Sequence, residues 1–385
     1  MKLPVYLDHA ATTPVAPEVL QAMLPFFDPC FGNPSAIYTL AQEARDAVER
    51  ARQQVAELVN ADPDDVYFTS GGTESDNWAI KGVVRAWDGK RNQLITTPIE
   101  HHAVLEACHA VRELGWEVTF LPVDRTGMVD PDDVRRAISP RTGLISVMHA
   151  NNEVGTIEPI AQIGAIAREY GVPFHTDAVQ TVGRIPVDMQ ALNVDLLAIS
   201  AHKLYGPKGV GALIVRRGTP LRPLLDGGGQ ERGRRGGTYN VPGIVGFGAA
   251  AERALRYGAQ EMERIRALRD RLIEGILERV PDAILTGHPV HRLPNNAHLA
   301  FSGVEGESLV LSLDAAGIYC SAGAACSSGD TEPSHVLVAM GIEPHLIEGS
   351  VRFTLGKDNT EEQIDYTIEQ VVRAVQKLRS LRVSG

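Results

Sequence analysis

Residues 194–211 read VDLLAISAHKLYGPKGVG: an apolar run, then a His-Lys pair and a loop rich in glycine and proline. The apolar run predicts a strand buried on both faces of a sheet. The lysine that follows, Lys203, has two interpretations. Lysine is mostly exposed, so Lys203 can be an ordinary surface residue. Alternatively, it is an amine in a pocket, with a pKa low enough to bond covalently to a carbonyl cofactor.

Apolar runs of this kind recur along the chain and alternate with segments of helical periodicity. We expect strands at 65–70, 93–97, 117–121, 143–149, 172–177, 194–200 and 211–215. We expect helices between them, at 37–59, 73–87, 100–114 and 159–170. Such alternation predicts an α/β domain with a doubly wound, mainly parallel sheet. After residue 255 the pattern changes to a long helix (about 256–280), mixed strands and a final helix (360–381), which predicts a smaller α+β domain.

The composition excludes several classes of protein. The chain has 385 residues and a formal net charge of −11, which argues against an overall nucleic-acid or anionic-membrane binder, although ERGRRGG (231–237) faintly resembles an RNA-binding segment. Its four cysteines show neither a Cys-x-x-Cys pair nor zinc-type spacing with histidine, so we expect no metal site. No apolar segment follows MKLPVYLD and no run is long enough to span a membrane, so we expect a protein of the reducing cytoplasm.

Polar residues follow several of the predicted strands, at the edge where an open α/β sheet binds ligands. SGGTESDN (70–77) combines bare glycine backbone with Thr73 near a helix start, which suits a phosphate but also an ordinary helix cap. His101 and His102 are adjacent, so on a helix they should not both face one site. Asp177 ends an apolar run and needs a partner if it is buried.

Together these features fit pyridoxal phosphate better than any of them does alone. A phosphate group favours a helix N-terminus with hydroxyl groups, a pyridinium nitrogen favours a carboxylate, and an aldehyde favours a lysine. The chain places Thr73, Asp177 and Lys203 after three different predicted strands. This combination favours the pocket interpretation of Lys203.

The motifs in their order closely resemble NifS/IscS-type cysteine desulfurases of the class V aminotransferase superfamily, which use pyridoxal phosphate. The resemblance spans residues 3 to about 380. It rests on YLDHAATTP, FGNPSAIY, FTSGGTESDNWAIKG, EHHAV, MHANNEVG, HTDAVQTVGRIPVD, SAHKLYGPKGVGAL, GGGQERGRRGGT, AGAACSSG and SVRFTLG. It implies fold type I, with a large domain of residues 15–255 around a mainly parallel seven-stranded sheet. Residues 1–14 and 256–385 would form the small domain that carries the catalytic cysteine loop.

The resemblance also implies a role for each matching residue. Lys203 would bond to the cofactor aldehyde, Asp177 would pair with the ring nitrogen, and His101 would stack on the ring and assist proton transfer. The remaining cofactor contacts would be Gly72, Thr73, Asn152, Gln180, Ser200, His202 and, from the second subunit of a homodimer, Thr238. The substrate L-cysteine would contact Asn33, Asn152 and Arg352. The partner would be a sulfur acceptor such as an iron–sulfur scaffold or a tRNA-thiolation protein.

The resemblance also implies that Cys326 is the nucleophile that takes up the substrate sulfur as a thiolate. Its setting, SAGAACSSGD, is small and glycine-containing, which suits a mobile loop that carries the sulfur away. The long segment after it matches the long-loop group of the family. His9 stands where asparagine or tyrosine is usual, and Ala324 where serine is frequent. Two other readings stay open: a class V aminotransferase or lyase, which needs no thiol, and a scaffold or RNA-binding protein, which leaves Lys203 without a purpose.

Overall fold

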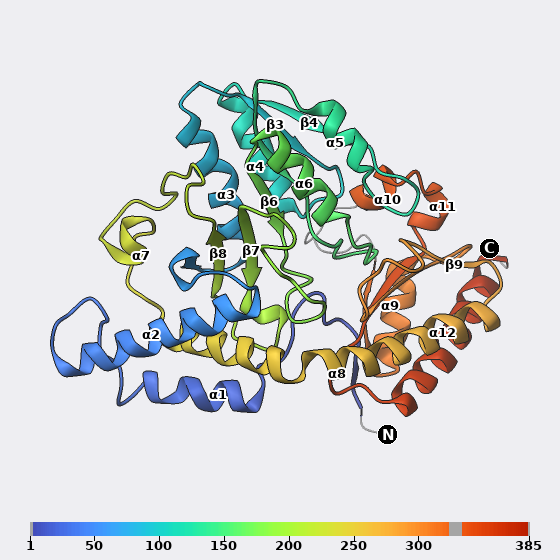
Figure 1. The fold of residues 1–385 in the computed structure, drawn as a ribbon. Helices are drawn as coiled ribbons and strands as arrows, with labels where there is room; N and C mark the ends of the chain where they lie inside the picture. Colours follow the sequence, from blue (N-terminus) through green and yellow to red (C-terminus); the bar gives the residue numbers. More distant parts are fainter. Residues whose placement is uncertain (1–2, 323–332, 384–385) are drawn as a thin grey trace.

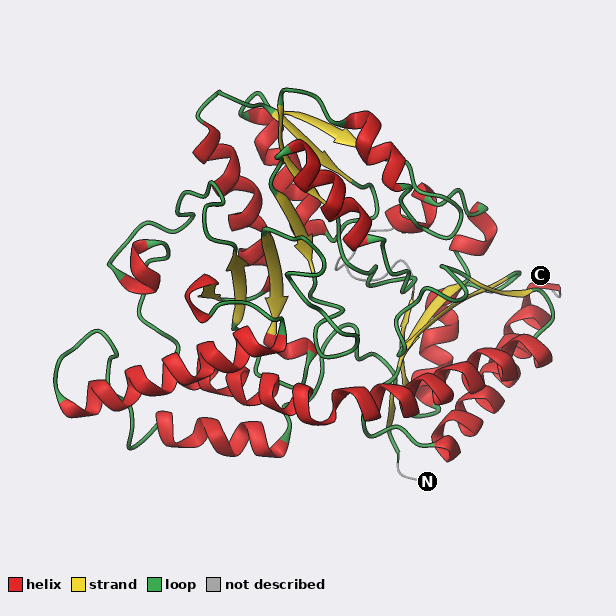
Figure 2. Cartoon of the chain, viewed as in Figure 1, coloured by secondary structure: helices red, strands yellow, loops and turns green. Residues whose placement is uncertain are grey.

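A seven-stranded sheet forms the centre of the larger part of the molecule (Figure 1; Figure 2). The computed structural model describes residues 3–322 and 333–383. The strand order is β2-β8-β7-β6-β5-β3-β4, and only β8 runs antiparallel to its neighbours. The strands are β2 (Val66–Thr69), β3 (Gln93–Thr96), β4 (Glu117–Phe120), β5 (Thr142–Ser146), β6 (Phe174–Asp177), β7 (Leu196–Ser200) and β8 (Gly211–Val215). Each lies in or beside a run predicted to be a strand, so the predicted mainly parallel seven-stranded sheet is confirmed.

Helices cover both faces of this sheet, as the apolar strands require. Successive residues of a strand point to opposite faces, and Leu196 packs in one core cluster while Leu197 packs in another. One cluster contains α3 (Gly72–Trp87) and α4 (His102–Glu113). The other contains α1 (Pro17–Met23), α2 (Thr39–Leu58), α5 (Pro131–Ala137), α6 (Ile160–Tyr170) and the start of α8 (Val241–Arg279). Short connecting elements are η1 (Leu24–Phe26), η2 (Pro63–Asp65), η3 (Ala201–Lys203) and α7 (Gln230–Gly233).

The smaller part is built on a four-stranded antiparallel sheet of order β12-β13-β10-β9. These strands are β9 (Ala283–Leu285), β10 (Asn296–Phe301), β12 (Ser321–Ala322) and β13 (Ser350–Thr354). The N-terminal strand β1 (Val5–Tyr6) joins this part by pairing with β11 (Ile318–Tyr319). Helices α9 (Gly306–Ala315) and α12 (Glu361–Val383) pack in its core, whereas α10 (His335–Ala339) and α11 (Pro344–Ile347) pack in a separate cluster with Ile99, Met148 and Val154 of the larger part. No helix in the described part of the chain has the length and apolar character needed to cross a bilayer.

Helix α8 connects the two parts (Figure 1). Its first half, including Phe247, packs in the core below the large sheet, and its second half, including Leu272, packs in the core of the small sheet. The sequence predicted this helix from about 256, but it begins fifteen residues earlier, at Val241. A proline at the start of a helix is tolerated, so Pro242 does not prevent it.

Candidate active site

A cavity of about 670 Å³ opens at the carboxyl ends of the large sheet's strands, between the two parts. Strands β6 and β7 end there at Asp177 and Ser200, as expected for a ligand site in an open α/β sheet. Ten of the residues selected from the sequence line this cavity together: Gly72, Thr73, His101, Asn152, Asp177, Gln180, Ser200, His202, Lys203 and Arg352.

Lys203 is half-buried in this cavity and is not an ordinary surface lysine. It ends η3, the 3₁₀ turn directly after β7, which turns its side chain across the sheet edge. Its Nζ donates to the carbonyl oxygens of Ala10 and Ala11, each at 2.6 Å. Burial, with the positive charges of Arg184 and Arg352, lowers the pKa of Lys203 to about 7. A substantial share of neutral amine, the form that reacts with a carbonyl group, is therefore present at neutral pH.

Two buried carboxyl groups lie in the same cavity. Asp177 accepts a hydrogen bond of 2.8 Å from the Val179 backbone N–H, and burial raises its pKa to about 6. Asp76, in α3, also lines the cavity; burial and the charges of Asp177 and Glu100 raise its pKa well above the usual value. The Asp76 Oδ1 atom accepts no hydrogen bond from the described residues, although the Nε2 atom of the buried His175 lies 3.5 Å from it. The sequence did not single out Asp76, although it stands one helical turn after Thr73.

Helix α3 begins at the cavity with an uncapped N-terminus. Its cap residue is Gly71, at φ +153°, and no side chain of the described residues bonds to the first-turn amides. A Cβ on Gly72 would lie 2.8 Å from a methyl group of Val179, so only glycine fits there. Thr73 lies within the first turn and is not a helix cap. The free amides and the helix dipole make this end a site for an anion.

Both histidines of the EHHAV motif line the cavity, so the expectation that only one faces it was wrong. The helical spacing does not apply, because His101 is the N-cap of α4 and has an extended backbone. Its Nδ1 accepts the Ala103 N–H at 3.1 Å, which leaves the ring proton on Nε2. Although the side chain is exposed within the cavity, desolvation and the charge of Lys203 lower the pKa of His101 to about 4.

Arg352 enters the cavity from β13 in the small part. Its Nη1 donates to the backbone oxygen of Asn152 at 3.0 Å, and its Nη2 to Asp8 at 2.9 Å. The Nε atom is buried and has no acceptor among the described residues. A buried guanidinium with an unsatisfied donor suits a carboxylate ligand.

Gln180 and His9 are held by a second arginine, which the sequence did not single out. Arg184 is buried and donates to the Gln180 side-chain oxygen at 2.7 Å and to the His9 backbone oxygen at 2.9 Å. The unusual His9 is accommodated by glycine, because a Cβ on Gly356 would lie 2.0 Å from its Nε2 atom. His9 therefore packs beside the cavity and does not line it.

Three of the residues selected from the sequence are not among those that line the cavity. Asn33 and Thr238 are exposed on the surface of the same chain. Cys326 lies outside the described residues, but Ala322 and Pro333, the described residues that flank its segment, both line the cavity.

Pyridoxal phosphate fits this set of groups. The bare N-terminus of α3 suits its phosphate, the buried Asp177 carboxyl suits its ring nitrogen, and the Lys203 amine suits its aldehyde. The groups come from separate strands and meet only at this edge of the sheet.

Comparisons with known proteins agree with the fold and with this site. The family model "Aminotransferase class-V" matches residues 5–367. The cysteine desulfurase IscS of Dictyoglomus turgidum is 53% identical over 381 residues, which are 99% of this chain and 97% of the relative. The IscS of Methanosarcina thermophila is 52% identical over 98% of this chain and 93% of its own length.

Solved structures give the same result. A NifS-like protein superposes with a TM-score of 0.92 and is 38% identical, covering 97% of this chain and all of its own. The structure of SspA in complex with cysteine superposes with a TM-score of 0.81 at 36% identity, covering 92% of this chain and all of its own. Enzymes of this family depend on pyridoxal phosphate. The chain belongs to the class-V aminotransferase family and, within it, to the cysteine desulfurases of the IscS/NifS type.

Proposed function

We propose that this protein removes the sulfur atom of L-cysteine, releases L-alanine and holds the sulfur as a persulfide on Cys326. The observation that carries the proposal is the meeting of Lys203, Asp177 and Arg352 in one cavity at the end of α3. The flanks of the Cys326 segment line the same cavity. Cys326 follows Ala322 by four residues in the sequence.

Each cavity residue has a task that its environment supports. The Arg352 guanidinium would bind the substrate carboxylate, with Asn152 as a further contact. Asn33 does not line the cavity of its own chain, and its contact with the substrate rests on the family resemblance alone. The Gly72 and Thr73 end of α3, with Ser200 and His202, would hold the cofactor phosphate, and Gln180 would contact the ring's phenolic oxygen. Bound pyridoxal phosphate supplies a ring that withdraws electrons from the substrate α-carbon. Asp177 would keep the ring nitrogen protonated, and His101 would stack on the ring.

Proton movement falls to Lys203 and His101. With a pKa lowered to about 7, the Lys203 amine can accept and return a proton near neutral pH. His101 is neutral and carries its proton on Nε2, so it can donate a hydrogen bond to a group bound inside the cavity.

Cys326 would complete the reaction as a thiolate, because only the thiolate is nucleophilic. An S–S bond forms between Cys326 and the substrate sulfur as the substrate C–S bond breaks. The electron pair of that bond stays on the substrate carbon, which takes up a proton and becomes the methyl group of alanine. The sulfur is then passed to a thiol of an acceptor protein, such as an iron–sulfur scaffold or a tRNA-thiolation protein, in a reducing cytoplasm.

The experiment is a turnover assay of the purified holoenzyme with L-cysteine, measuring alanine and sulfide, followed by mass spectrometry of the Cys326 peptide. We expect equal amounts of alanine and transferable sulfur, and one added sulfur atom on Cys326. Formation of pyruvate and ammonia with sulfide, in place of alanine, would identify a lyase, and formation of 3-mercaptopyruvate would identify a transaminase; either product would contradict the proposal.

We propose a homodimer as the working form. Thr238 is exposed outside the cavity of its own chain, where it can contact the cofactor phosphate of a second subunit. The segment of the chain between α1 and α2 carries several exposed apolar side chains: Phe27, Phe31, Ile37 (87% exposed) and Tyr38. A second subunit could cover them, because exposed apolar surface is typical of sites of protein contact. Sedimentation of the holoenzyme should give a dimer, and a monomer with full cofactor occupancy would contradict this.

The division into domains is part of the same proposal. Residues 15–255 would form the cofactor-binding domain, and residues 1–14 with 256–385 the small domain that brings Arg352 and Cys326 to it. The observation in support is that α8 changes from one core to the other between Ala251 and Met262.

A further inference from the structure

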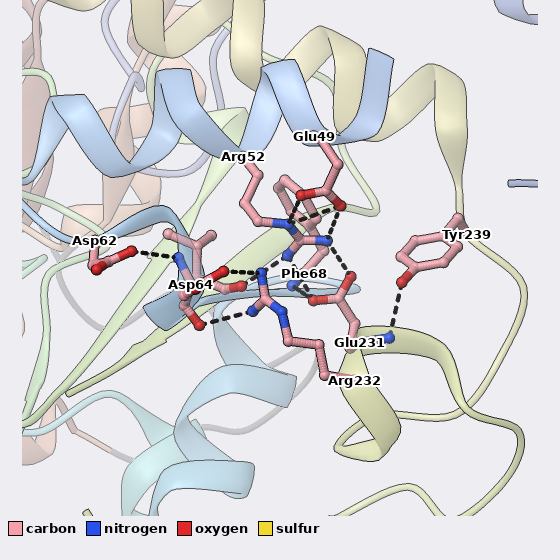
Figure 3. Close-up of polar contacts among 9 residues, drawn as sticks. Glu49, Arg52, Asp62, Asp64, Phe68, Glu231, Arg232 and Tyr239 are labelled. Atoms are coloured by element: carbon pink, nitrogen blue, oxygen red, sulfur yellow. Dashed lines mark hydrogen bonds and ion pairs between the residues drawn. The ribbon is translucent and has the colours of Figure 1, made fainter. Parts of the chain in front are cut away.

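The glycine-rich segment 226–239 is fixed to the rest of its own chain by charged side chains (Figure 3). This segment contains ERGRRGG and then Thr238. Three of its five charged residues form ion pairs with groups of the large part. The pairs are Glu231 with Arg52, Arg232 with Asp64, and Arg235 with Glu74. These arginines therefore neutralise carboxylates of the chain itself and form an internal attachment.

The central pair is fully enclosed. Arg52 of α2 and Glu231 of α7 are each 2% exposed. Two hydrogen bonds join them, from Nη1 to Oε2 at 2.9 Å and from Nη2 to Oε1 at 3.0 Å. The Arg52 guanidinium also lies 4.8 Å from the centre of the Phe68 ring. A two-bond pair of this kind fixes orientation as well as distance.

The same two side chains form hydrogen bonds with backbone groups at the free edge of the large sheet. Strand β2 is an edge strand, and its outer side leaves backbone groups without a neighbouring strand. Glu231 Oε2 accepts the Phe68 N–H at 2.9 Å, and Arg52 Nη1 donates to the Val66 oxygen at 2.7 Å. These two hydrogen bonds therefore fix the position of the segment along strand β2.

The backbone at Glu231 and Arg232 adopts a conformation that is unfavourable for residues other than glycine. Glu231 and Arg232 have φ values of +44° and +57°, in the left-handed region that favours glycine. The Glu231 N–H donates to the Tyr239 hydroxyl at 2.9 Å, which ties the segment's start to its end. Such a conformation persists only where the surroundings over-determine it, and it is concentrated at functional segments.

A second attachment leads to the phosphate end of α3. Arg235 donates from Nε to Glu74 Oε1 at 2.8 Å and from Nη2 to Oε2 at 3.0 Å. Glu74 is next to Thr73 in the first turn of α3. The segment that presents Thr238 is thus fixed to the helix end that lines its own cavity.

We propose that Glu231, held by Arg52, is a positioning residue for Thr238: it sets the segment so that Thr238 reaches the cofactor phosphate of the second subunit. A buried ion pair rarely adds stability over apolar residues of similar size, but it specifies geometry. A contact between two subunits requires that the contacting residue be held in a defined position. This inference rests on the proposed contact between Thr238 and the partner's cofactor.

The test is a double-mutant cycle on the full-length dimer. The cofactor is removed and titrated back, and the dissociation constant of pyridoxal phosphate is measured by absorbance for wild type, Glu231→Ala, Thr238→Ala and the double variant. We expect each single variant to bind about tenfold more weakly, as for a lost contact to a charged group. Because Glu231 acts through Thr238, we expect the double variant to match Thr238→Ala within about twofold.

Matched controls separate positioning from general damage. Glu343→Ala removes a carboxylate from the exposed Arg125–Glu343 pair and should leave cofactor affinity unchanged. Sedimentation should show that every variant remains dimeric. If Glu231→Ala cannot be recovered folded, the cycle uses Arg52→Lys, which keeps the charge but not the two-bond geometry.

Three outcomes would overturn the inference. Additive effects, near a hundredfold in the double variant, would mean that Glu231 acts independently of Thr238. Dissociation of the dimer in Glu231→Ala would show a structural role. Normal cofactor affinity in Thr238→Ala would remove the cross-subunit contact as well, whereas desulfurase turnover, measured separately on wild type, decides the proposed function itself.

Discussion

Two regions of this chain bury charged side chains, but one leaves some of their polar atoms without hydrogen bonds within the described part of the chain and the other pairs them. Around Lys203, Asp76 Oδ1 and Arg352 Nε have no hydrogen-bond partner among the described residues, and burial lowers the pKa of Lys203 to about 7. In the Arg52–Glu231 pair, by contrast, both carboxylate oxygens accept hydrogen bonds from Arg52.

The difference distinguishes a site that is prepared to bind and react with a ligand from a pair that holds part of the structure in place. Leaving a buried polar group unsatisfied is costly, so unsatisfied atoms grouped in a cavity indicate a place prepared for a ligand. Groups whose pKa is shifted toward neutrality can exchange protons near neutral pH. A fully hydrogen-bonded pair has no unsatisfied atom to offer to a ligand, and it instead fixes a segment in space. The following predictions test this contrast.

The largest effect is expected at Lys203. Lys203→Ala should abolish the covalent bond between cofactor and protein and lower turnover by about 10³-fold or more, because both the bond and the proton transfer are lost. Borohydride reduction followed by mass spectrometry measures the bond, and alanine release measures turnover. Lys208→Ala is the matched control, since Lys208 is exposed on the same loop. A reducible cofactor adduct that survives in Lys203→Ala would show that the reactive amine lies elsewhere.

Cys326→Ser should separate substrate binding from sulfur transfer. The cofactor's absorbance should still change when L-cysteine is added, because Lys203, Asp177 and Arg352 remain. Sulfide and alanine release should fall by about 10²-fold or more, since a serine hydroxyl is hardly ionised and forms no persulfide. Full activity in this variant would contradict the assignment of the nucleophile.

The same substitution, glutamate to glutamine, should have opposite effects in an unsatisfied carboxyl group and in a paired one. Glu100 is fully buried below the cavity, its Oε2 has no donor among the described residues, and burial raises its pKa to about 8. Between pH 4.5 and about 8 the folded state therefore binds more protons than the unfolded state, so the free energy of unfolding falls as pH rises through this window.

Glu100→Gln should remove that pH dependence and stabilise the protein by about 1–3 kcal/mol near pH 9. Glu231→Gln should instead destabilise it by about 1–3 kcal/mol, because it weakens a satisfied pair. Urea unfolding of the cofactor-free protein at several pH values gives both numbers. Equal signs for the two variants would break the proposed contrast.

The sequence predicted the seven strands well, because strands buried on both faces are short continuous apolar runs. It placed the start of α8 too late, since VPGIVGFGAA contains three glycines that obscure the helical pattern. The structure explains two of them. A Cβ on Gly246 would lie 2.6 Å from the Met23 sulfur, and one on Gly248 would lie 2.6 Å from the Ala51 Cα, so α8 crosses α1 and α2 closely. Tertiary packing, not helix propensity, selected these residues.

At the site, the residues whose side chains take part in the chemistry could be selected from the sequence. The groups that hold those side chains in position could not. The carbonyl oxygens of Ala10 and Ala11 hold Lys203, and a backbone carbonyl has no sequence signature. Glu231 belongs to a segment that faintly resembles an RNA-binding sequence, and only the fold shows its buried partner, 179 positions away. The spacing argument for His101 failed because it assumed a helical residue at what is a helix cap.

The smallest effect is expected at Cys320, which contrasts with Cys326 six positions later. Cys320 lies between β11 and β12, packs against the core of the small sheet, and has its pKa raised to about 12 by burial. It is therefore an inert thiol at neutral pH. Cys320→Ser should destabilise the protein by about 1 kcal/mol, the cost of placing a hydroxyl in a partly apolar site, and should leave most turnover intact. Thermal unfolding and the alanine assay measure the two effects, with Cys108→Ser as a second buried thiol for comparison.

Sulfur found on Cys320 and not on Cys326 after reaction with L-cysteine would reverse the roles of the two thiols.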